Sequence, residues 1–139
     1  MTSLVGTGSC HYEQRLTADP KRIGDVRRIV TAYLRYWGWG ELVDPAAMCV
    51  TELLSNVSRH ANSDECVLHL ETSDTGVRIV VSDDTPTVPV VLEPDCFSDS
   101  GRGMFLLSET ADAWGVVPTD KGKDVWVEIG PASEEVATL

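Results

Sequence analysis

Positive charge is scarce in this sequence. Its 139 residues include 11 Lys and Arg against 22 Asp and Glu, which gives a formal net charge of -11 at pH 7. A surface this acidic repels the phosphates of nucleic acids and of anionic membranes. We therefore expect no nucleic acid and no membrane as a partner, and proteins or small ligands instead.

Long apolar runs and paired cysteines are also missing. No stretch approaches the ~20 apolar residues of a membrane-spanning helix. The first residues, MTSLVGTGSC, have neither the basic start nor the apolar centre of a secretory signal. The four cysteines form no CxxC motif, whereas zinc sites need closely paired ligands; they are Cys10, Cys49, Cys66 and Cys96. We expect a cytoplasmic protein with reduced thiols, two of them in apolar stretches that become core.

No internal repeat or low-complexity tract divides the chain. Its length suits one domain, and 42% apolar residues suffice to close one core. Small and acidic residues in the final segment, PASEEVATL, suggest fraying. We expect a flexible N-terminus over residues 1–10, a single folded domain over 11–130, and a flexible tail over 131–139.

Apolar residues at helical spacing predict two consecutive helices. The first begins at Pro20 and ends at WGWGE, where glycines break the pattern. The second begins with Asp44 as N-cap and Pro45 as first helical residue, and it ends near Asn62. One face of the first helix is basic and reads either as solvated surface or as a docking site; it carries Arg22, Arg27, Arg28 and Arg35.

Alternating apolar residues predict the strands. Residues 11–17 form an edge strand, 65–72 and 76–82 pair antiparallel around the turn SDTG, and the segments AWGVVPT and KDVWVEIG surround the turn DKG. A long connection over residues 83–100 precedes a third helix at GRGMFLLSETA. The order of elements predicts an α+β two-layer sandwich, with a mostly antiparallel sheet and helices on one face.

Three polar features stand out from this scaffold. The second helix places Glu52, Asn56 and His60 four residues apart, largely opposite its core-facing residues. Asp83 comes just past the end of a buried strand, where a carboxylate is costly unless a partner donates hydrogen bonds to it. GRG, residues 101–103, leads into a helix, where backbone N–H groups can meet phosphate oxygens. Each feature alone is also typical of a solvent-exposed helix face or of a turn. Together they supply the parts that a nucleotide needs.

These segments carry a resemblance. ELLSNVSRHA resembles the N-box, VSDDTPTVP the G1 box and GRGMFLL the G2 box of the GHKL (Bergerat-fold) ATPase superfamily. Their order and spacing resemble those in the small anti-sigma-factor serine kinases of bacteria, the SpoIIAB/RsbW-like group. The sequence as a whole resembles actinobacterial members of that group. The resemblance spans about Leu16 to Ile129, and the closing GKDVWVEI is similar to the final strand of those proteins.

The resemblance implies a role for each matching position. Asn56 would coordinate the Mg²⁺ that bridges the phosphates of ATP, and Glu52 would be the general base that deprotonates a serine or threonine hydroxyl. Asp83 would accept from the adenine amine, residues 84–100 would form the ATP lid, and His60 would have a packing or hydrogen-bonding role. The remaining nucleotide contacts would come from Thr85, Gly101, Arg102, Gly103 and Met104.

Two positions depart from the pattern of these relatives. Thr85 stands where many of them have glycine. Asp124 stands where a threonine often helps to hold the aspartate and an adenine-bound water. We expect the Asp124 carboxylate to repel that of Asp83, unless it points away or is protonated.

The resemblance also implies partners and leaves alternatives open. It implies ATP or ADP with Mg²⁺, a sigma factor, and a small anti-anti-sigma-like protein as phosphorylation substrate. The alternatives are a nucleotide-gated adaptor that transfers no phosphate and a degenerate domain that binds proteins alone. A homodimer is a further expectation, since the region of the first strand and helix carries aromatic residues that fit either a dimer face or the core; they are Tyr12, Tyr36, Trp37 and Trp39.

Overall fold

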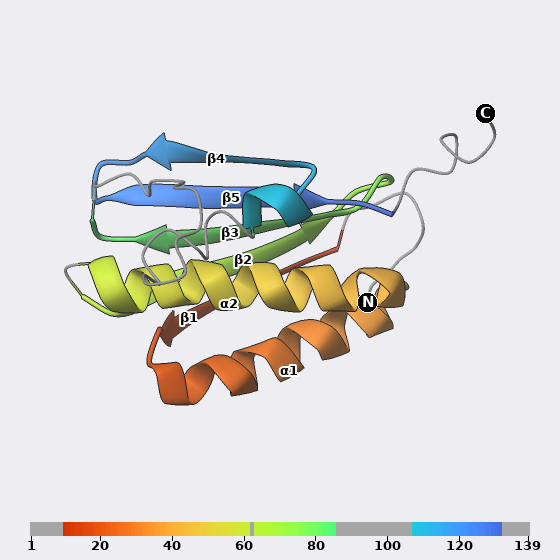
Figure 1. Ribbon diagram of the computed structural model, residues 1–139, viewed down its shortest axis with the longest axis horizontal. Coiled ribbons are helices and arrows are strands. Elements are labelled where there is room, and N and C mark those ends of the chain that lie inside the picture. Colours follow the sequence, from red (N-terminus) through yellow and green to blue (C-terminus); the bar gives the residue numbers. More distant parts are fainter. Residues whose placement is uncertain (1–9, 62, 86–106, 132–139) are drawn as a thin grey trace.

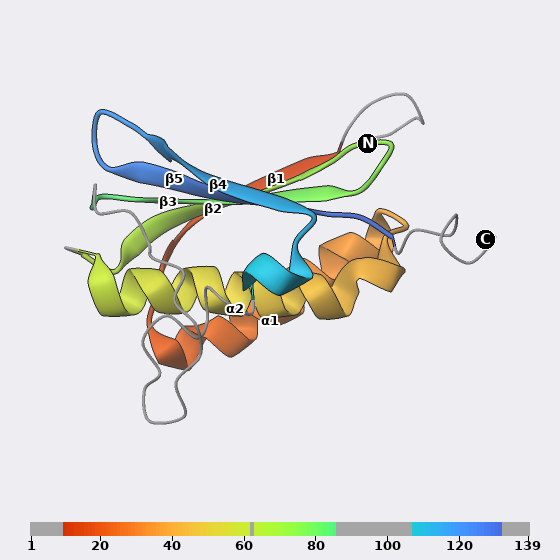
Figure 2. The same cartoon turned by 45° about the horizontal axis from the view of Figure 1, so that its top comes forward.

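Two long helices cover one face of an antiparallel sheet (Figures 1 and 2). The computed structural model describes residues 10–61, 63–85 and 107–131. Both views place the helices on the same side of the strands, so the predicted α+β two-layer sandwich is confirmed. The expected flexible ends lie almost entirely outside the described residues. No helix in the described part of the chain is long and apolar enough to cross a membrane.

Five strands in the described residues form one sheet in the order β1-β2-β3-β5-β4. Every neighbouring pair is antiparallel, and β5 lies between β3 and β4 although it follows β4 in the chain. The predicted strands are confirmed to within a residue or two; they are β1 (His11–Thr17), β2 (Glu65–Thr72), β3 (Val77–Asp83), β4 (Ala113–Pro118) and β5 (Lys123–Ile129). The predicted edge position of the first strand is also confirmed.

Helix α1 (Pro20–Tyr36) begins and ends at the signals in the sequence. The Asp19 side chain accepts a hydrogen bond from the Lys21 N–H at 2.9 Å, and Pro20 occupies the first turn, where a missing N–H breaks no helical bond. Gly38 has φ 87°, a conformation that favours glycine, and it turns the chain out of the helix.

Helix α2 (Val43–His60) starts differently from the prediction. The assignment of Asp44 as N-cap is wrong, because Leu42 holds that position and Asp44 lies within the first turn. A 3₁₀ turn, η1 (Gly40–Leu42), leads directly into the helix, and Val43 already has helical angles, φ -58° and ψ -47°. The helix ends at His60 with Ala61 as C-cap, slightly before the predicted end.

The core lies between α2 and the inner face of the sheet. Leu53 and Leu54 of α2 are buried against the predicted inward rows of β2, β3 and β5, which are confirmed. The buried members of these rows are Cys66, Leu68, Leu70, Val77, Ile79, Val81, Val125, Val127 and Ile129. This packing fixes which side of α2 faces away from the core and is left for polar residues.

The aromatic residues near β1 and α1 were expected to belong either to a dimer face or to the core, and they differ in exposure. Tyr12 stacks on Tyr33 with ring centroids 4.2 Å apart, and Trp37 lies 5.2 Å from the same ring, so both contribute to packing beside the core, as Trp39 does. Tyr36 is 81% exposed. A dimer face therefore stays a prediction, with Tyr36 as its available aromatic side chain.

Truncating a core leucine of α2 tests this packing. We expect Leu54→Ala to lower the free energy of unfolding by about 2–5 kcal/mol, because the cavity left in a fully buried layer is only partly filled by relaxation. Denaturation with urea, followed by circular dichroism, measures the change. Val117→Ala is the matched control, since Val117 is 47% exposed; a similar loss in both variants would contradict the assigned core.

Candidate functional site

The polar side of α2 presents two half-buried groups. Glu52 and Asn56 lie one helical turn apart, so their side chains share a face. The Asn56 Nδ2 atom is buried and has no hydrogen-bond partner. Among the described residues, nothing donates a hydrogen bond to the Glu52 carboxylate. A buried amide without a partner costs about 1–3 kcal/mol, which is typical of a group that a ligand completes. The side chain of His60 lies outside the described residues.

Asp83 ends β3 directly opposite the first residue of β5. The sequence placed it just past the strand, but it is the last strand residue, and its Cα pairs with that of Lys123. The Lys123 Nζ lies 3.0 Å from both carboxylate oxygens of Asp83. The two side chains are 7% and 4% exposed, for Lys123 and Asp83 respectively, so this ion pair is almost fully withdrawn from water.

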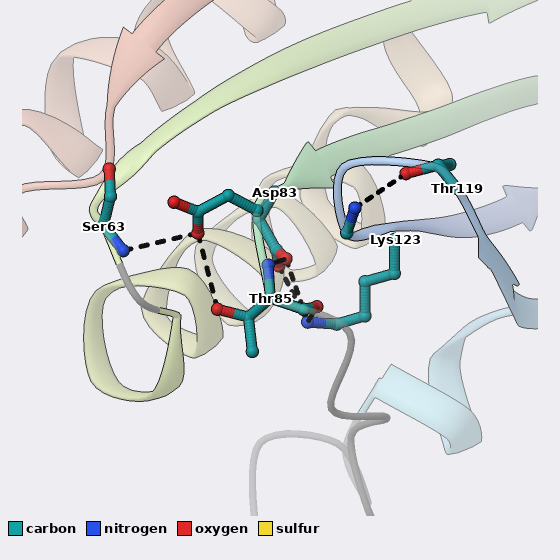
Figure 3. A network of polar contacts seen from close by, with 7 residues as sticks. Ser63, Asp83, Thr85, Thr119 and Lys123 are labelled. Carbon is teal, nitrogen blue, oxygen red and sulfur yellow. Dashed lines mark hydrogen bonds and ion pairs between the residues drawn. The ribbon is translucent and has the colours of Figure 1, made fainter.

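Thr85 is fixed through both of its backbone groups. Its N–H donates to Asp83 Oδ1 at 2.8 Å, and its carbonyl accepts from Lys123 Nζ at 2.8 Å. Figure 3 shows Lys123 reaching across from β5 to Asp83 and Thr85. Thr85 itself is buried, at 5% exposure. The ends of β3 and β5 therefore fix the position of Thr85.

Asp84 joins this cluster to the end of α2. The Ser63 N–H donates to its carboxylate at 3.3 Å, and the Thr85 hydroxyl lies 3.4 Å from the same oxygen (Figure 3). Ser63 follows α2 closely in the chain, and the C-terminal end of α2 lies at the same end of the molecule as the end of β3 (Figure 1). The fold thus brings the C-terminal end of α2 to the end of the sheet that carries Asp83.

Sequence reasoning chose the wrong neighbour for Asp83. The expected repulsion between Asp124 and Asp83 does not arise, because Asp124 points away. It pairs with Ser82 and lies on the opposite face of the sheet from Asp83. Lys123, which the sequence analysis passed over, is the residue that contacts Asp83. The alternation of β5 contained the signal: counting back in twos from Val127 and Val125 leads to Lys123 on the inward face.

Gly122 allows the strand ends to approach. A Cβ atom at this position would lie 2.1 Å from the Asp83 carbonyl oxygen and 2.7 Å from the Asp84 backbone. Only glycine leaves room for the backbone there. Its N–H donates to the Thr119 hydroxyl at 3.0 Å, which closes the turn between β4 and β5 (Figure 3).

The buried cysteines do not add chemistry to this site. Burial, and then the charges of Asp83 and Asp64, raise the pKa of Cys66 to about 12. Burial, and then the charge of Glu52, raise the pKa of Cys49 to about 12. Both thiols are neutral at physiological pH, and a neutral thiol is a poor nucleophile. The expectation of free thiols is confirmed for Cys10, Cys49 and Cys66, while Cys96 lies outside the described residues.

A metal ion would have to share its ligands with a bound molecule. Within residues 10–61, 63–85 and 107–131, no three His, Cys, Asp or Glu side chains are grouped closely enough to hold one. Mg²⁺ commonly binds one or two protein oxygens and takes the rest of its ligands from phosphates and water. The carboxamide oxygen of Asn56 suits this habit, and its unpaired Nδ2 could donate to a phosphate oxygen. The expected phosphate segment, Gly101, Arg102, Gly103 and Met104, lies outside the described residues.

Breaking the buried ion pair tests the geometry at the strand ends. We expect Lys123→Met to lower the free energy of unfolding by about 3–5 kcal/mol, because it leaves the Asp83 carboxylate buried without its counter-charge. The double variant Asp83→Asn/Lys123→Met restores part of the loss. Chemical denaturation measures both, with Lys121→Met as control because Lys121 is exposed. Equal stability of Lys123→Met and the control would contradict the buried pair.

The comparison with known families agrees with this architecture. No curated protein matches the sequence. The family model described as "Histidine kinase-like ATPase domain" matches residues 16–129, most of the chain and all of its described core. The five-stranded antiparallel sheet with helices on one face agrees with the Bergerat fold of that family, which implies ATP binding and a general requirement for Mg²⁺. This chain therefore belongs to the histidine kinase-like ATPase domain family.

Proposed function

We propose that this protein is an ATP- and Mg²⁺-dependent protein serine/threonine kinase of the anti-sigma-factor type. It would bind a sigma factor, phosphorylate a small anti-anti-sigma-like protein, and so control transcription. Family membership supports the nucleotide. The observation that carries the kinase step is the placement of Glu52 and Asn56 on the same polar side of α2, an uncommitted acid one turn from an unpaired amide.

Glu52 is the carboxylate beside Asn56 on α2, and it is free to take a proton. Asp83 is held by Lys123, and Asp84 accepts from Ser63, whereas Glu52 accepts no hydrogen bond from the described residues. In the proposed step, Glu52 accepts the proton of a serine or threonine hydroxyl. The hydroxyl oxygen then bonds to the γ-phosphorus while the bond to the β–γ bridging oxygen breaks, which yields the phosphorylated protein and ADP.

Asn56 would position the phosphates for this transfer. Its carboxamide oxygen would coordinate Mg²⁺, which offsets the negative charge of the phosphates. Asp83 would accept a hydrogen bond from the base, and Thr85 would lie beside it. The glycines at 101 and 103, with Arg102 and Met104, would complete the phosphate contacts. Phosphoryl transfer needs mainly positioning and charge neutralisation, so this small set of groups suffices.

One observation favours the alternative of a nucleotide-gated adaptor without kinase activity. Three hydrogen bonds already occupy most of the acceptor capacity of the Asp83 carboxylate. A base that finds a single acceptor position there would bind more weakly than one that meets a free carboxylate. A weakly bound nucleotide exchanges readily, which suits a switch between partner proteins more than an enzyme that must hold ATP for transfer.

Labelled ATP distinguishes the two functions. With Mg²⁺ and a panel of candidate serine-containing acceptor proteins, we expect Glu52→Gln to lower phosphate transfer by about 10²–10⁴-fold, because it removes the general base. ATP affinity, measured by calorimetry, stays near that of the unmodified chain. Asn56→Ala lowers both transfer and the dependence of ATP binding on Mg²⁺.

Glu41→Gln is the matched control, since it makes the same change at an exposed carboxylate in η1. Undiminished transfer in Glu52→Gln would refute the assigned base. ATP binding without transfer to any acceptor in the panel would support the adaptor, and absence of ATP binding at millimolar nucleotide would refute both.

A further inference from the structure

The Lys123 ammonium is directed at acceptors within the protein. An ammonium group has three N–H donors. Three acceptors surround the Lys123 Nζ: the two carboxylate oxygens of Asp83 at 3.0 Å and the Thr85 carbonyl at 2.8 Å. The lysine is therefore satisfied from within, and with a side chain that is 7% exposed it is not directed at a base that enters beside Asp83.

Asp83 keeps one acceptor position. A carboxylate has about four lone-pair sites, two on each oxygen. Oδ1 accepts from both the Thr85 N–H and Lys123, while Oδ2 accepts from Lys123 alone. The free position is on Oδ2, and because the side chain is 4% exposed, little freedom remains for the carboxylate to turn toward another donor.

We propose that Lys123 is a positioning residue that makes the site selective for a base with an exocyclic amine over a base with a carbonyl at the same position. It balances the charge of Asp83 and holds Oδ2 as a fixed acceptor. A carbonyl would meet that acceptor, because the Lys123 ammonium is directed at Asp83 and the Thr85 carbonyl. This inference rests on the proposed function, in which Asp83 receives the base.

The contacts of Lys123 favour this role over a purely structural one. Replacing a buried ion pair by apolar side chains of similar size is often neutral or stabilising, so packing alone does not require a lysine here. Val125, two residues further along the same face of β5, shows that an apolar residue is accommodated in this row. A lysine on the inward face of β5 is explained by its contact with Asp83, whose Oδ2 it holds as a fixed acceptor.

Adenosine and inosine triphosphates test the selectivity, since inosine carries a carbonyl in place of the adenine amine. We expect the unmodified chain to bind ATP about 10- to 100-fold more tightly than ITP, as for one hydrogen bond to a charged group. In Lys123→Met we expect this ratio to fall toward 1, because the carboxylate loses its counter-charge and its fixed orientation. Calorimetry with Mg²⁺ measures both affinities, and circular dichroism confirms that the variant is folded.

Lys121→Met, which removes the same charge from an exposed position, should keep the ratio of the unmodified chain. A structural role for Lys123 would lower both affinities together, so an unchanged ratio in Lys123→Met overturns the inference. An unmodified chain that binds ATP and ITP equally also overturns it and leaves ATP binding intact, whereas a chain that binds neither refutes the proposed function itself.

A second pair of variants answers the question if Lys123→Met does not fold. In Asp83→Asn, the ammonium of Lys123 holds the amide oxygen, so the amide N–H₂ faces the base and ITP gains over ATP. In Asp83→Asn/Lys123→Met the amide oxygen is held by the Thr85 N–H alone, so that bias is weakened. We expect their ATP-to-ITP ratios to differ by at least about threefold, the effect of a weak single hydrogen bond; equal ratios overturn the inference.

Discussion

The opposite charges of Asp83 and Lys123 constrain the arrangement of the sheet around them. Both side chains are nearly buried, and removing either partner would leave a charge whose burial costs several kcal/mol. The pair can form only if β3 and β5 are neighbours in the register that sets residue 83 opposite residue 123. The same register places Val81 opposite Val125 in the core and Ser82 opposite Asp124 on the outer face. One buried contact is thus linked to the sorting of polar and apolar residues over both strands.

The ion pair of Asp83 and Lys123 also connects the core of the sheet to the polar site at its end. Gly122 brings the start of β5 close to the backbone of Asp83, and Lys123 then fixes Thr85 through its carbonyl. On the outer face, Trp126 lies against Gly115 of the edge strand, with the Arg78 guanidinium 4.8 Å from the ring centroid. These contacts hold β3, β4 and β5 together beyond their backbone hydrogen bonds. The site therefore stands on strands rather than on loops, which favours accurate placement of Asp83.

The sequence predicted those parts of the fold that depend on local spacing. Alternation identified the inward rows of the sheet, and Asp19 with Pro20 identified the start of α1, because these signals act within a few residues. The start of α2 was mispredicted, since the turn at Gly40–Leu42 replaced the side-chain cap expected of Asp44. The position of β5 between β3 and β4 and the contact of Lys123 with Asp83 depend on pairing over 40 residues, which spacing along the chain does not reveal. The segment at residues 101–104 stays a prediction.

Charge determines how so acidic a protein could hold a polyanionic ligand. The net charge is -11, and Lys123 is already committed to Asp83 and Thr85, so it offers no compensation to phosphate. Under the proposed function, that compensation has to come from a divalent cation held at Asn56 and from backbone N–H groups, which attract phosphate without adding a side-chain charge. The same cation would lessen the repulsion between Glu52 and the phosphates. That repulsion acts at short range in a partly buried environment, where water screens charges weakly. A metal-bound nucleotide is then the form that this site can accept, and the dependence on the cation follows from the acidity of the chain as much as from the chemistry of transfer.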